Sequence, residues 1–394
     1  LVLVSGSISD ELGNSETFPT RKEYDQRTID IRNSTLTAVF RRVQRARRLA
    51  QKSAETIAQF VDPSTDPRVS ELHSLAGLIY LMFAENYCSG VPISEANDDG
   101  SLTFGPPQTT QQLVDLALGQ FDEALAAGAN ATVTNLGKVL KGRTLLYSGD
   151  FAGAAAAVAG VPTGFVYATT HTIALGRQQN GLFVFINQNE RFSVANLDGG
   201  NGLPFRDAMD PRVPWIRTGG NDVGFDNATP QYDQGKFYDE TAPVPVATGV
   251  EARLIEAENL LKTGDVNGWL GILNELRANT DLVPQKFPAT FPATSPFPPL
   301  EPLTDPGSQT AREDLMFSER AFWLYLSGHR LADLRRMVRQ YGRSADAVFP
   351  GGGGAPYVIN GNNKGGVFGV DVTLPIPFDE QNNPEFTECI DRNP

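Results

Sequence analysis

Residues 139–158, VLKGRTLLYSGDFAGAAAAV, contain an aliphatic helical pattern, a small Gly-Asp turn and an alanine-rich partner. The same design returns at residues 254–273, LIEAENLLKTGDVNGWLGIL. A short turn between two amphipathic helices makes them antiparallel neighbours. Both stretches therefore predict helix hairpins that stack side by side.

The helical period recurs along much of the chain. Apolar residues at three- and four-residue steps predict further helices at about 36–57, 69–87, 109–127, 133–147 and within 310–341. These pairs follow the logic of tetratricopeptide-like repeats, although the strict repeat consensus is absent and the spacing is uneven. The sequence thus predicts a mostly α-helical fold built from degenerate helix pairs.

The helical period disappears between residues 162 and 250. This stretch is rich in Gly, Asn and Asp, and it holds short apolar runs such as LFVFI at 182–186, which are typical of strands. We expect an insertion of loops and small strands that the helical scaffold carries on its surface. One domain, 1–394, would then have three parts: helical pairs at 1–161, the irregular insertion at 162–250, and a helical part with an extended tail at 251–394.

Charge and hydropathy exclude several classes of protein. The net charge of −13 argues against nucleic acid or anionic lipid as the main partner, and small or neutral ligands fit better. The basic run RRVQRARR at 41–48 favours a solvated or acid-paired helix face over a nucleic-acid site. The longest apolar run, at 75–84, is far shorter than the roughly 20 residues that span a bilayer, so it indicates a buried helix.

No catalytic or metal-binding set stands out. The sequence lacks G-x-S-x-G and H-E-x-x-H, and its three histidines are widely scattered. Acidic pairs at 98–99 and 207–210 could hold a cation, but adjacent acids in loops are more often solvated turn residues. The charges within 318–337, SERAFWLYLSGHRLADLRRM, favour a structural ion-pair cluster over a reaction centre. We therefore expect no enzyme, no cofactor and no metal.

Aromatic residues of the irregular insertion are the remaining candidates for ligand binding. Rings on loops above a rigid body can stack on sugar faces or hold peptide side chains. The alternative for each ring is a place in the core. We choose Trp215, Tyr232 and Tyr238 as ligand-binding residues from a set that also includes Tyr167, Phe225 and Phe237.

Cys88 and Cys389 are the only cysteines of the chain. They do not form a metal-binding motif with each other or with the histidines. Counting alone leaves two interpretations open, namely two buried thiols or one disulfide.

Several motifs follow one another along the chain: SDELGNSETF, YCSGVPIS, PPQTTQQLVDLALGQFDEAL, VLKGRTLLYSGDFAGA, GVEARLIEAENLLKTGD, SERAFWLYLSGHRLADLRR and LPIPFDEQNNP. In this order they resemble the SusD/RagB family of surface nutrient-binding lipoproteins.

The resemblance implies a function and a location. It implies a protein at the outer-membrane cell surface that captures glycan or peptide nutrients for a SusC-like, TonB-dependent receptor, without catalysis. It also implies a lipid-accepting cysteine upstream of Leu1 as the membrane anchor. A structural or assembly protein of the cell surface, built on the same fold, is the alternative, and an enzyme comes third.

The resemblance also implies how the chain ends. In this family the C-terminal extended segment packs back along the helical body, so LPIPFDEQNNP at 374–384 should do the same. Cys389 then lies in a tail that returns to the helices, and export to an oxidising compartment would let it pair with Cys88. We therefore expect a disulfide between Cys88 and Cys389.

Overall fold

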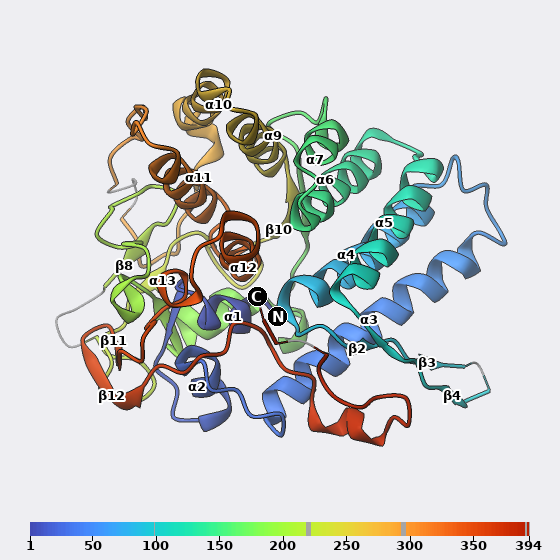
Figure 1. Cartoon of the computed structure of the whole chain (residues 1–394), viewed down its shortest axis with the longest axis horizontal. Coiled ribbons are helices and arrows are strands. Elements are labelled where there is room, and N and C mark those ends of the chain that lie inside the picture. Colours follow the sequence, from blue (N-terminus) through green and yellow to red (C-terminus); the bar gives the residue numbers. More distant parts are fainter. Residues whose placement is uncertain (98, 218–221, 293–296, 391, 394) are drawn as a thin grey trace. The chain divides into compact units, whose positions relative to one another are not determined.

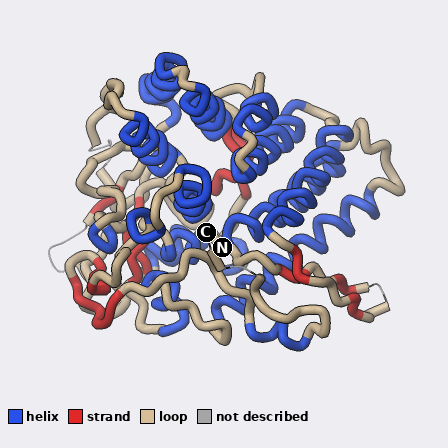
Figure 2. The backbone as a smooth tube through the Cα atoms, viewed as in Figure 1, coloured by secondary structure: helices blue, strands red, loops and turns tan. Residues whose placement is uncertain are grey.

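The computed structural model describes residues 1–97, 99–217, 222–292, 297–390 and 392–393. Thirteen α-helices lie in these residues, and their strands contain two to six residues each. Figure 2 shows the short strands among helices and long loops. The predicted mostly helical fold class is confirmed.

The chain packs into two compact units. The first, here called the hairpin unit, comprises Ile29–Phe165, Ala247–Glu256 and Thr373–Pro394. The second, here called the mixed unit, comprises Leu1–Thr28, Val166–Val246 and Ala257–Val372. Each unit is thus assembled from three separate stretches of chain.

The hairpin unit is built from helices that are consecutive in the chain. Within it α3 packs on α4, α4 on α5 and α6, α5 on α6, and α6 on α7, which Figure 1 shows as neighbouring helices. Two small strand pairs follow α4, with β2 against β5 and β3 against β4. The bounds are α3 Ser34–Ile57, α4 Pro67–Asn86, β2 Val91–Pro92, β3 Glu95–Ala96, β4 Leu102–Thr103, β5 Pro107–Gln108, α5 Thr110–Ala127, α6 Ala131–Ser148 and α7 Phe151–Val158.

The Gly-Asp turns work as the sequence predicts. Gly149 ends α6 at a φ of 93°, a left-handed conformation that glycine adopts without a Cβ penalty. The side chain of Asp150 then accepts a hydrogen bond from the Gly153 amide and caps α7. Gly264 and Asp265 repeat this arrangement before α10 (Val266–Ala278). One two-residue signal therefore stops one helix and starts the next.

The core of the hairpin unit combines rings with one buried ion pair. Phe40, Phe83 and Tyr87 meet at centroid distances of 5.4 to 5.5 Å. Glu85 accepts two hydrogen bonds from Arg143, at 2.6 and 2.7 Å, and both side chains are buried. This bidentate pair joins α4 to α6 inside the helix stack.

The C-terminal segment returns to these helices, as predicted. Leu374 bridges Tyr87, accepts a hydrogen bond from the Cys88 amide at 2.9 Å and donates one to the Asn86 carbonyl at 2.8 Å. Leu374 and Ile376 are both buried. Further along, the structure joins Cys88 and Cys389 in a disulfide, with the two Cα atoms 6.0 Å apart. The tail is held by backbone pairing, apolar burial and one covalent bond.

The mixed unit contains the remaining helices and most of the strands. Antiparallel pairs join β1 to β7, β8 to β9 and β11 to β12, and β10 pairs with β6. Helix α9 and strand β10 run on into the hairpin unit along the chain. The bounds are α1 Val2–Ile8, β1 Leu12–Asn14, α2 Pro19–Gln26, β6 Val166–Thr169, α8 Gly181–Phe183, β7 Phe192–Val194, β8 Trp215–Ile216, β9 Asp233–Gln234, β10 Val244–Thr248, α9 Gly249–Thr263, α11 Gln309–Trp323, α12 Arg330–Tyr341, α13 Ala345–Val348, β11 Pro356–Ile359 and β12 Asn362–Val367.

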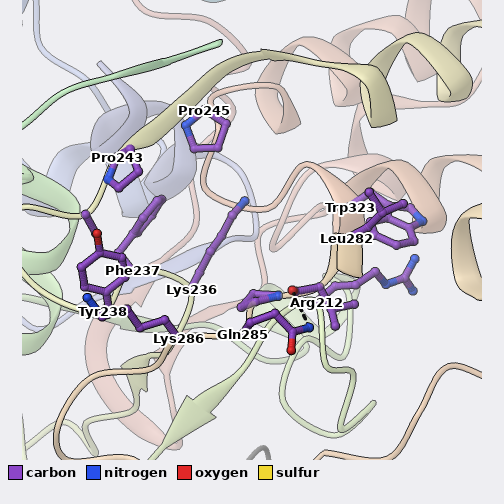
Figure 3. Close-up of a pocket in the computed structure, with 13 residues that line it drawn as sticks. Arg212, Lys236, Phe237, Tyr238, Pro243, Pro245, Leu282, Gln285, Lys286 and Trp323 are labelled. Atoms are coloured by element: carbon purple, nitrogen blue, oxygen red, sulfur yellow. Dashed lines mark hydrogen bonds between the residues drawn. The ribbon is translucent and has the colours of Figure 1, made fainter. Parts of the chain in front are cut away.

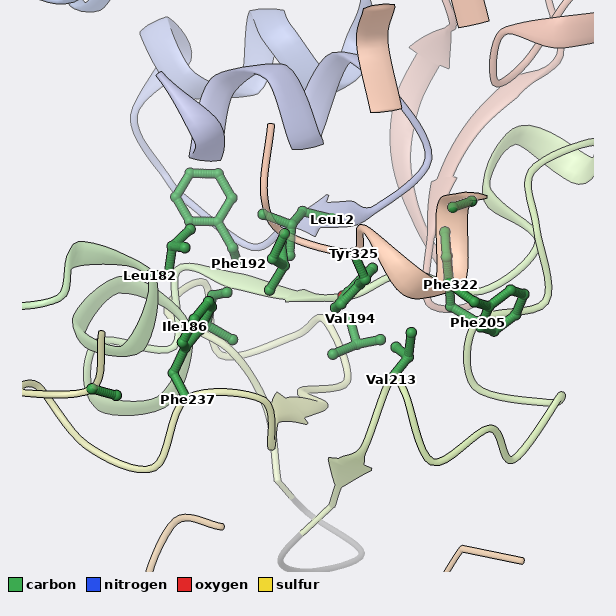
Figure 4. Close-up of a cluster of buried hydrophobic side chains, with 13 residues drawn as sticks. Leu12, Leu182, Ile186, Phe192, Val194, Phe205, Val213, Phe237, Phe322 and Tyr325 are labelled. Carbon is green, nitrogen blue, oxygen red and sulfur yellow. The ribbon is translucent and has the colours of Figure 1, made fainter. Parts of the chain in front are cut away.

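The irregular stretch 162–250 does not lie simply on the surface, which corrects the prediction. It supplies Phe192, Val194, Phe205 and Phe237 to a buried cluster that also contains Tyr325 of the C-terminal part (Figure 4). Phe192 and Val194 lie on β7, whereas Phe205 and Phe237 lie in loops, so irregular segments also contribute buried side chains. This cluster forms a core of the mixed unit.

Residues 182–186 form helical turns, so the prediction of a β-like run there is wrong. The Asn180 side chain accepts hydrogen bonds from the Leu182 and Phe183 amides and caps α8. A π-helix at Val184–Gln188 follows directly. An apolar run of this length does not distinguish a strand from a buried helix, and the local cap decides the outcome.

Candidate functional site

The charged helix pair at 318–337 forms a buried ion network. Asp333 accepts hydrogen bonds from Arg320 at 2.9 Å and from Arg336 at 3.0 Å. Arg336 and the Tyr341 hydroxyl also donate to Glu258 of α9. All four ionic side chains are nearly inaccessible, so they lock α9, α11 and α12 together within the mixed unit. The predicted structural role of these charges is confirmed.

A second network contains Asp210, one member of the predicted acidic pair at 207–210. Asp210 and Glu319 both accept hydrogen bonds from Arg212, at 2.6 to 3.0 Å, and Glu319 also accepts one from Arg277. The Asp210 carboxylate is therefore paired with the Arg212 guanidinium. Within the described residues no group of three or more His, Cys, Asp or Glu side chains is placed to hold a metal ion. Of the other acidic pair, Asp98 lies outside the described residues.

The basic run at 41–48 is split between surface and interior. Arg41 pairs with Asp379 at 2.6 Å on the surface of the hairpin unit. Arg47 is buried and donates hydrogen bonds to Gln44, Gln51 and the Ser94 carbonyl at 2.6 to 3.0 Å. These contacts give the two arginines structural roles.

Trp215 and Tyr232 lie against each other in the mixed unit. Their ring centroids are 5.5 Å apart in an edge-to-face arrangement, and both half-buried rings pack on the hydrophobic cluster. The Arg206 guanidinium lies over the Tyr232 ring at 3.5 Å, and the Trp215 indole N–H donates to the Arg206 carbonyl at 3.2 Å. Arg206 thus covers one face of Tyr232 and holds Trp215 in place.

Tyr238 lies elsewhere, at a pocket of about 340 Å³. The segment after β9 contributes Lys236, Phe237 and Tyr238 to the lining, and the loop after Thr280–Leu282 contributes Gln285 and Lys286. The wall is completed by Arg212, Ala242, Pro243, Pro245, Leu282, Val283, Pro284 and Trp323. Its volume is near the lower end of the range for small-ligand sites, roughly 300–1,000 Å³. The space suits a small ligand or one part of a longer one.

Two lysines give this pocket its electrostatic character. The Lys286 ammonium lies 3.4 Å from the centre of the Tyr238 ring. Lys236 donates to the Tyr325 carbonyl, and burial lowers its pKa to about 8, so it is mostly protonated at neutral pH. Figure 3 shows Lys236 between Tyr238 on one side and Trp323 on the other. The third cation, Arg212, is already paired with two carboxylates.

The predicted aromatic residues therefore occupy two places. Tyr238 lines the pocket, whereas Trp215 and Tyr232 form a packed pair with Arg206. Sequence reasoning missed Lys236 and Lys286. The adjacency of Lys236 to Phe237 and Tyr238 was a usable signal, but nothing local connects them to Lys286, which follows fifty residues later.

No family model and no curated protein sequence matches this chain. Solved structures do resemble it. One is a SusD-like protein from Bacteroides fragilis, at 14% identity and a TM-score of 0.67, covering 99% of this chain and 93% of that one. The chain has the SusD-like fold.

Two further structures with this fold are named for the glycan that they bind. A chitin-binding protein matches at 15% identity and a TM-score of 0.65, with 97% of this chain and 88% of that chain covered. A laminarin-binding SusD-like protein matches at 15% identity and a TM-score of 0.59, with 99% and 94% covered. In the described part of the chain, no helix is both long enough and apolar enough to cross a membrane.

Proposed function

We propose that this protein binds oligosaccharides at the cell surface and passes them to a TonB-dependent outer-membrane receptor. It is held there by a lipid on a cysteine upstream of Leu1, and it releases its ligand unchanged. Tyr238 contacts the bound sugar in the pocket that it shares with Lys236 and Lys286.

The observation that carries this proposal is the extent of the fold similarity. It covers nearly the whole chain, and the structures that share the fold include proteins named for binding chitin and laminarin. Peptide nutrients, the other class implied by the sequence resemblance, have no such support among these names. Glycan capture is therefore the function that the fold favours.

The pocket supports the same proposal. A half-buried tyrosine beside prolines and two lysines offers an apolar face together with hydrogen-bond donors, which is the combination that sugar rings require. Burial of one ring contributes on the order of 1 kcal/mol, so affinity for a short oligosaccharide should be modest.

Calorimetric titration with a panel of oligosaccharides tests the proposal. We expect Tyr238→Ala to weaken binding about fivefold, the equivalent of roughly 1 kcal/mol. Phe60→Ala is the matched control, because Phe60 is an exposed ring of the hairpin unit that lies outside the pocket. The Trp215→Ala/Tyr232→Ala double variant tests the earlier prediction for those two rings.

Three results would contradict the proposal: the protein binds no oligosaccharide, the protein converts one into a new product, or the Tyr238→Ala variant binds as well as the Phe60→Ala control. Affinity purification of the full-length protein from its native membrane, with identification of any receptor that accompanies it, addresses the proposed partner separately.

A further inference from the structure

We propose that the Tyr238 pocket selects acidic sugars, with Lys236 and Lys286 binding a carboxylate or sulfate group on the sugar ring. This inference rests on the proposed function and names its substrate class. The shared chemistry is a negatively charged substituent on a saccharide.

Within the described residues, neither ammonium group forms an ion pair with a carboxylate. Among the described residues, Lys236 contacts the Tyr325 carbonyl and the Phe237 ring, and Lys286 contacts the Tyr238 ring. The pocket lining contains no Asp or Glu. In contrast, Arg212 is neutralised by Asp210 and Glu319. Two cations without an ion pair therefore line a space that a ligand can enter.

Burial makes Lys236 costly to keep charged without a partner. Desolvation lowers its pKa to about 8, and the one carboxylate that acts on it, Glu11, is itself buried with a pKa raised to about 7. A ligand anion in the pocket would restore the interaction that burial removes from the ammonium. A charge-assisted hydrogen bond to such an anion is stronger than one to a sugar hydroxyl.

The position of Lys286 also argues for an ionic site. The Lys286 ammonium lies 3.4 Å from the centre of the Tyr238 ring, in cation–π contact, so a ring that lines the pocket holds a positive charge there. The ring thus fixes a cation as well as offering an apolar surface.

The acidic character of the whole chain does not oppose this local preference. The net charge of −13 acts at long range, where salt screens it beyond about 8 Å. Contact distances inside the pocket are shorter, and there the two lysines dominate. The general expectation of neutral ligands from composition therefore does not apply at this site.

A matched pair of ligands tests the charge directly. Calorimetry would compare oligogalacturonate with its methyl ester, and a carrageenan oligosaccharide with its desulfated form. The two pairs separate carboxylate from sulfate recognition. We expect the charged member of at least one pair to bind about tenfold more tightly at low salt, and the difference to shrink as salt is added.

Variants locate the effect. Lys286→Gln changes an exposed side chain and should remove most of the tenfold preference without altering the melting temperature. Lys236→Met is a second variant, and its melting temperature must be recorded because Lys236 also bonds the Tyr325 carbonyl. Lys138→Gln is the matched control, since it removes the same charge from α6 of the hairpin unit, where Lys138 contacts the Ala159 carbonyl.

The possible outcomes distinguish failure of the acidic-sugar inference from failure of the proposed glycan binding. Equal binding of charged and neutral forms would overturn the inference and leave glycan binding intact. A charge preference that survives Lys286→Gln and a folded Lys236→Met would place the anion elsewhere and also overturn it. Absence of binding to every oligosaccharide would overturn the proposed function itself.

Discussion

For several buried carboxylates of the mixed unit, desolvation outweighs the effect of any nearby cation. Burial raises the pKa values of Glu11, Asp25 and Asp233 to about 7, and it raises that of Asp198 well above its ordinary value. A folded state with raised acid pKa values binds more protons than the unfolded chain. The stability that this contributes is present at low pH and is lost as the pH rises toward 7.

Asp233 offers the clearest test, because the Asp222 and Glu190 carboxylates add to the effect of burial. Its pKa rises from 3.8 to about 7, so ionising it in the folded protein costs up to roughly 4 kcal/mol, at 1.36 kcal/mol per pKa unit. We expect Asp233→Asn to be nearly neutral at pH 4 and to stabilise the protein by up to that amount at pH 8. Urea unfolding at both pH values measures the difference.

Asp226 supplies the opposite control. Lys364 and the Thr229 hydroxyl and amide bond its carboxylate and lower its pKa to about 2. Asp226→Asn should therefore destabilise the protein at pH 8, and its effect should fade only as the pH falls toward 2. If Asp233→Asn changes the free energy of unfolding by the same amount at pH 4 and at pH 8, the raised pKa of Asp233 is contradicted.

At the scale of single residues, the sequence predicts which residues are candidates for binding better than it predicts which of them come together in a site. It points to the aromatic residues of the irregular stretch, yet the structure packs Trp215 against Tyr232 and leaves Tyr238 at a pocket. Lys286 reaches Tyr238 from a separate loop. Such a contact depends on tertiary folding, which no local pattern records.

Helices follow their local signals closely wherever caps and apolar periods agree. The predicted ranges 109–127 and 133–147 correspond to α5 and α6, whose ends are set by Thr109, Asn130 and Gly149. The short helices α1 and α2 escaped prediction because few turns of apolar period exist in them. The two helices pack against each other, and helices this short depend on such packing rather than on propensity alone.

Close packing of α4 on α5 depends on Gly77. A Cβ added there would lie 2.6 Å from the Phe121 ring, which is fully buried. We expect Gly77→Ala to destabilise the protein by about 1–3 kcal/mol, the usual cost of overpacking, despite the better helix propensity of alanine. Thermal unfolding measures the change.

Gly119 of α5 is the matched control for that substitution. It is exposed, and a Cβ added there would meet no atom within 4 Å. Gly119→Ala should therefore stabilise the protein by about 1 kcal/mol through helix propensity alone. If both alanine variants stabilise the protein equally, Gly77 is not required by the α4–α5 contact.

For the molecule as a whole, consecutive stretches of sequence are a poor guide to packing. The three predicted parts, 1–161, 162–250 and 251–394, follow chain order, whereas each compact unit draws on three separated stretches. Periodicity reveals neighbours in sequence but not partners hundreds of residues apart. The return of the C-terminal segment was expected only from the family resemblance, and its Leu374 pairing with α4 is a long-range contact of this kind.

The Cys88–Cys389 disulfide acts at the same scale, because it joins residues 301 positions apart. Closing a loop of this size restricts the unfolded chain, and the chain-entropy model gives about 6 kcal/mol as an upper figure. We expect the Cys88→Ser/Cys389→Ser double variant to melt at a lower temperature than the oxidised wild type, and protease to remove its last residues faster. Reduced wild-type protein is the control and should match the variant. The contacts of Leu374 lie before the residues that the protease removes, so residues 374–384 should stay in place in both forms.

Mass spectrometry of unreduced peptides measures the bond itself. Recovery of Cys88 and Cys389 as separately alkylated thiols from oxidised, exported protein would refute it.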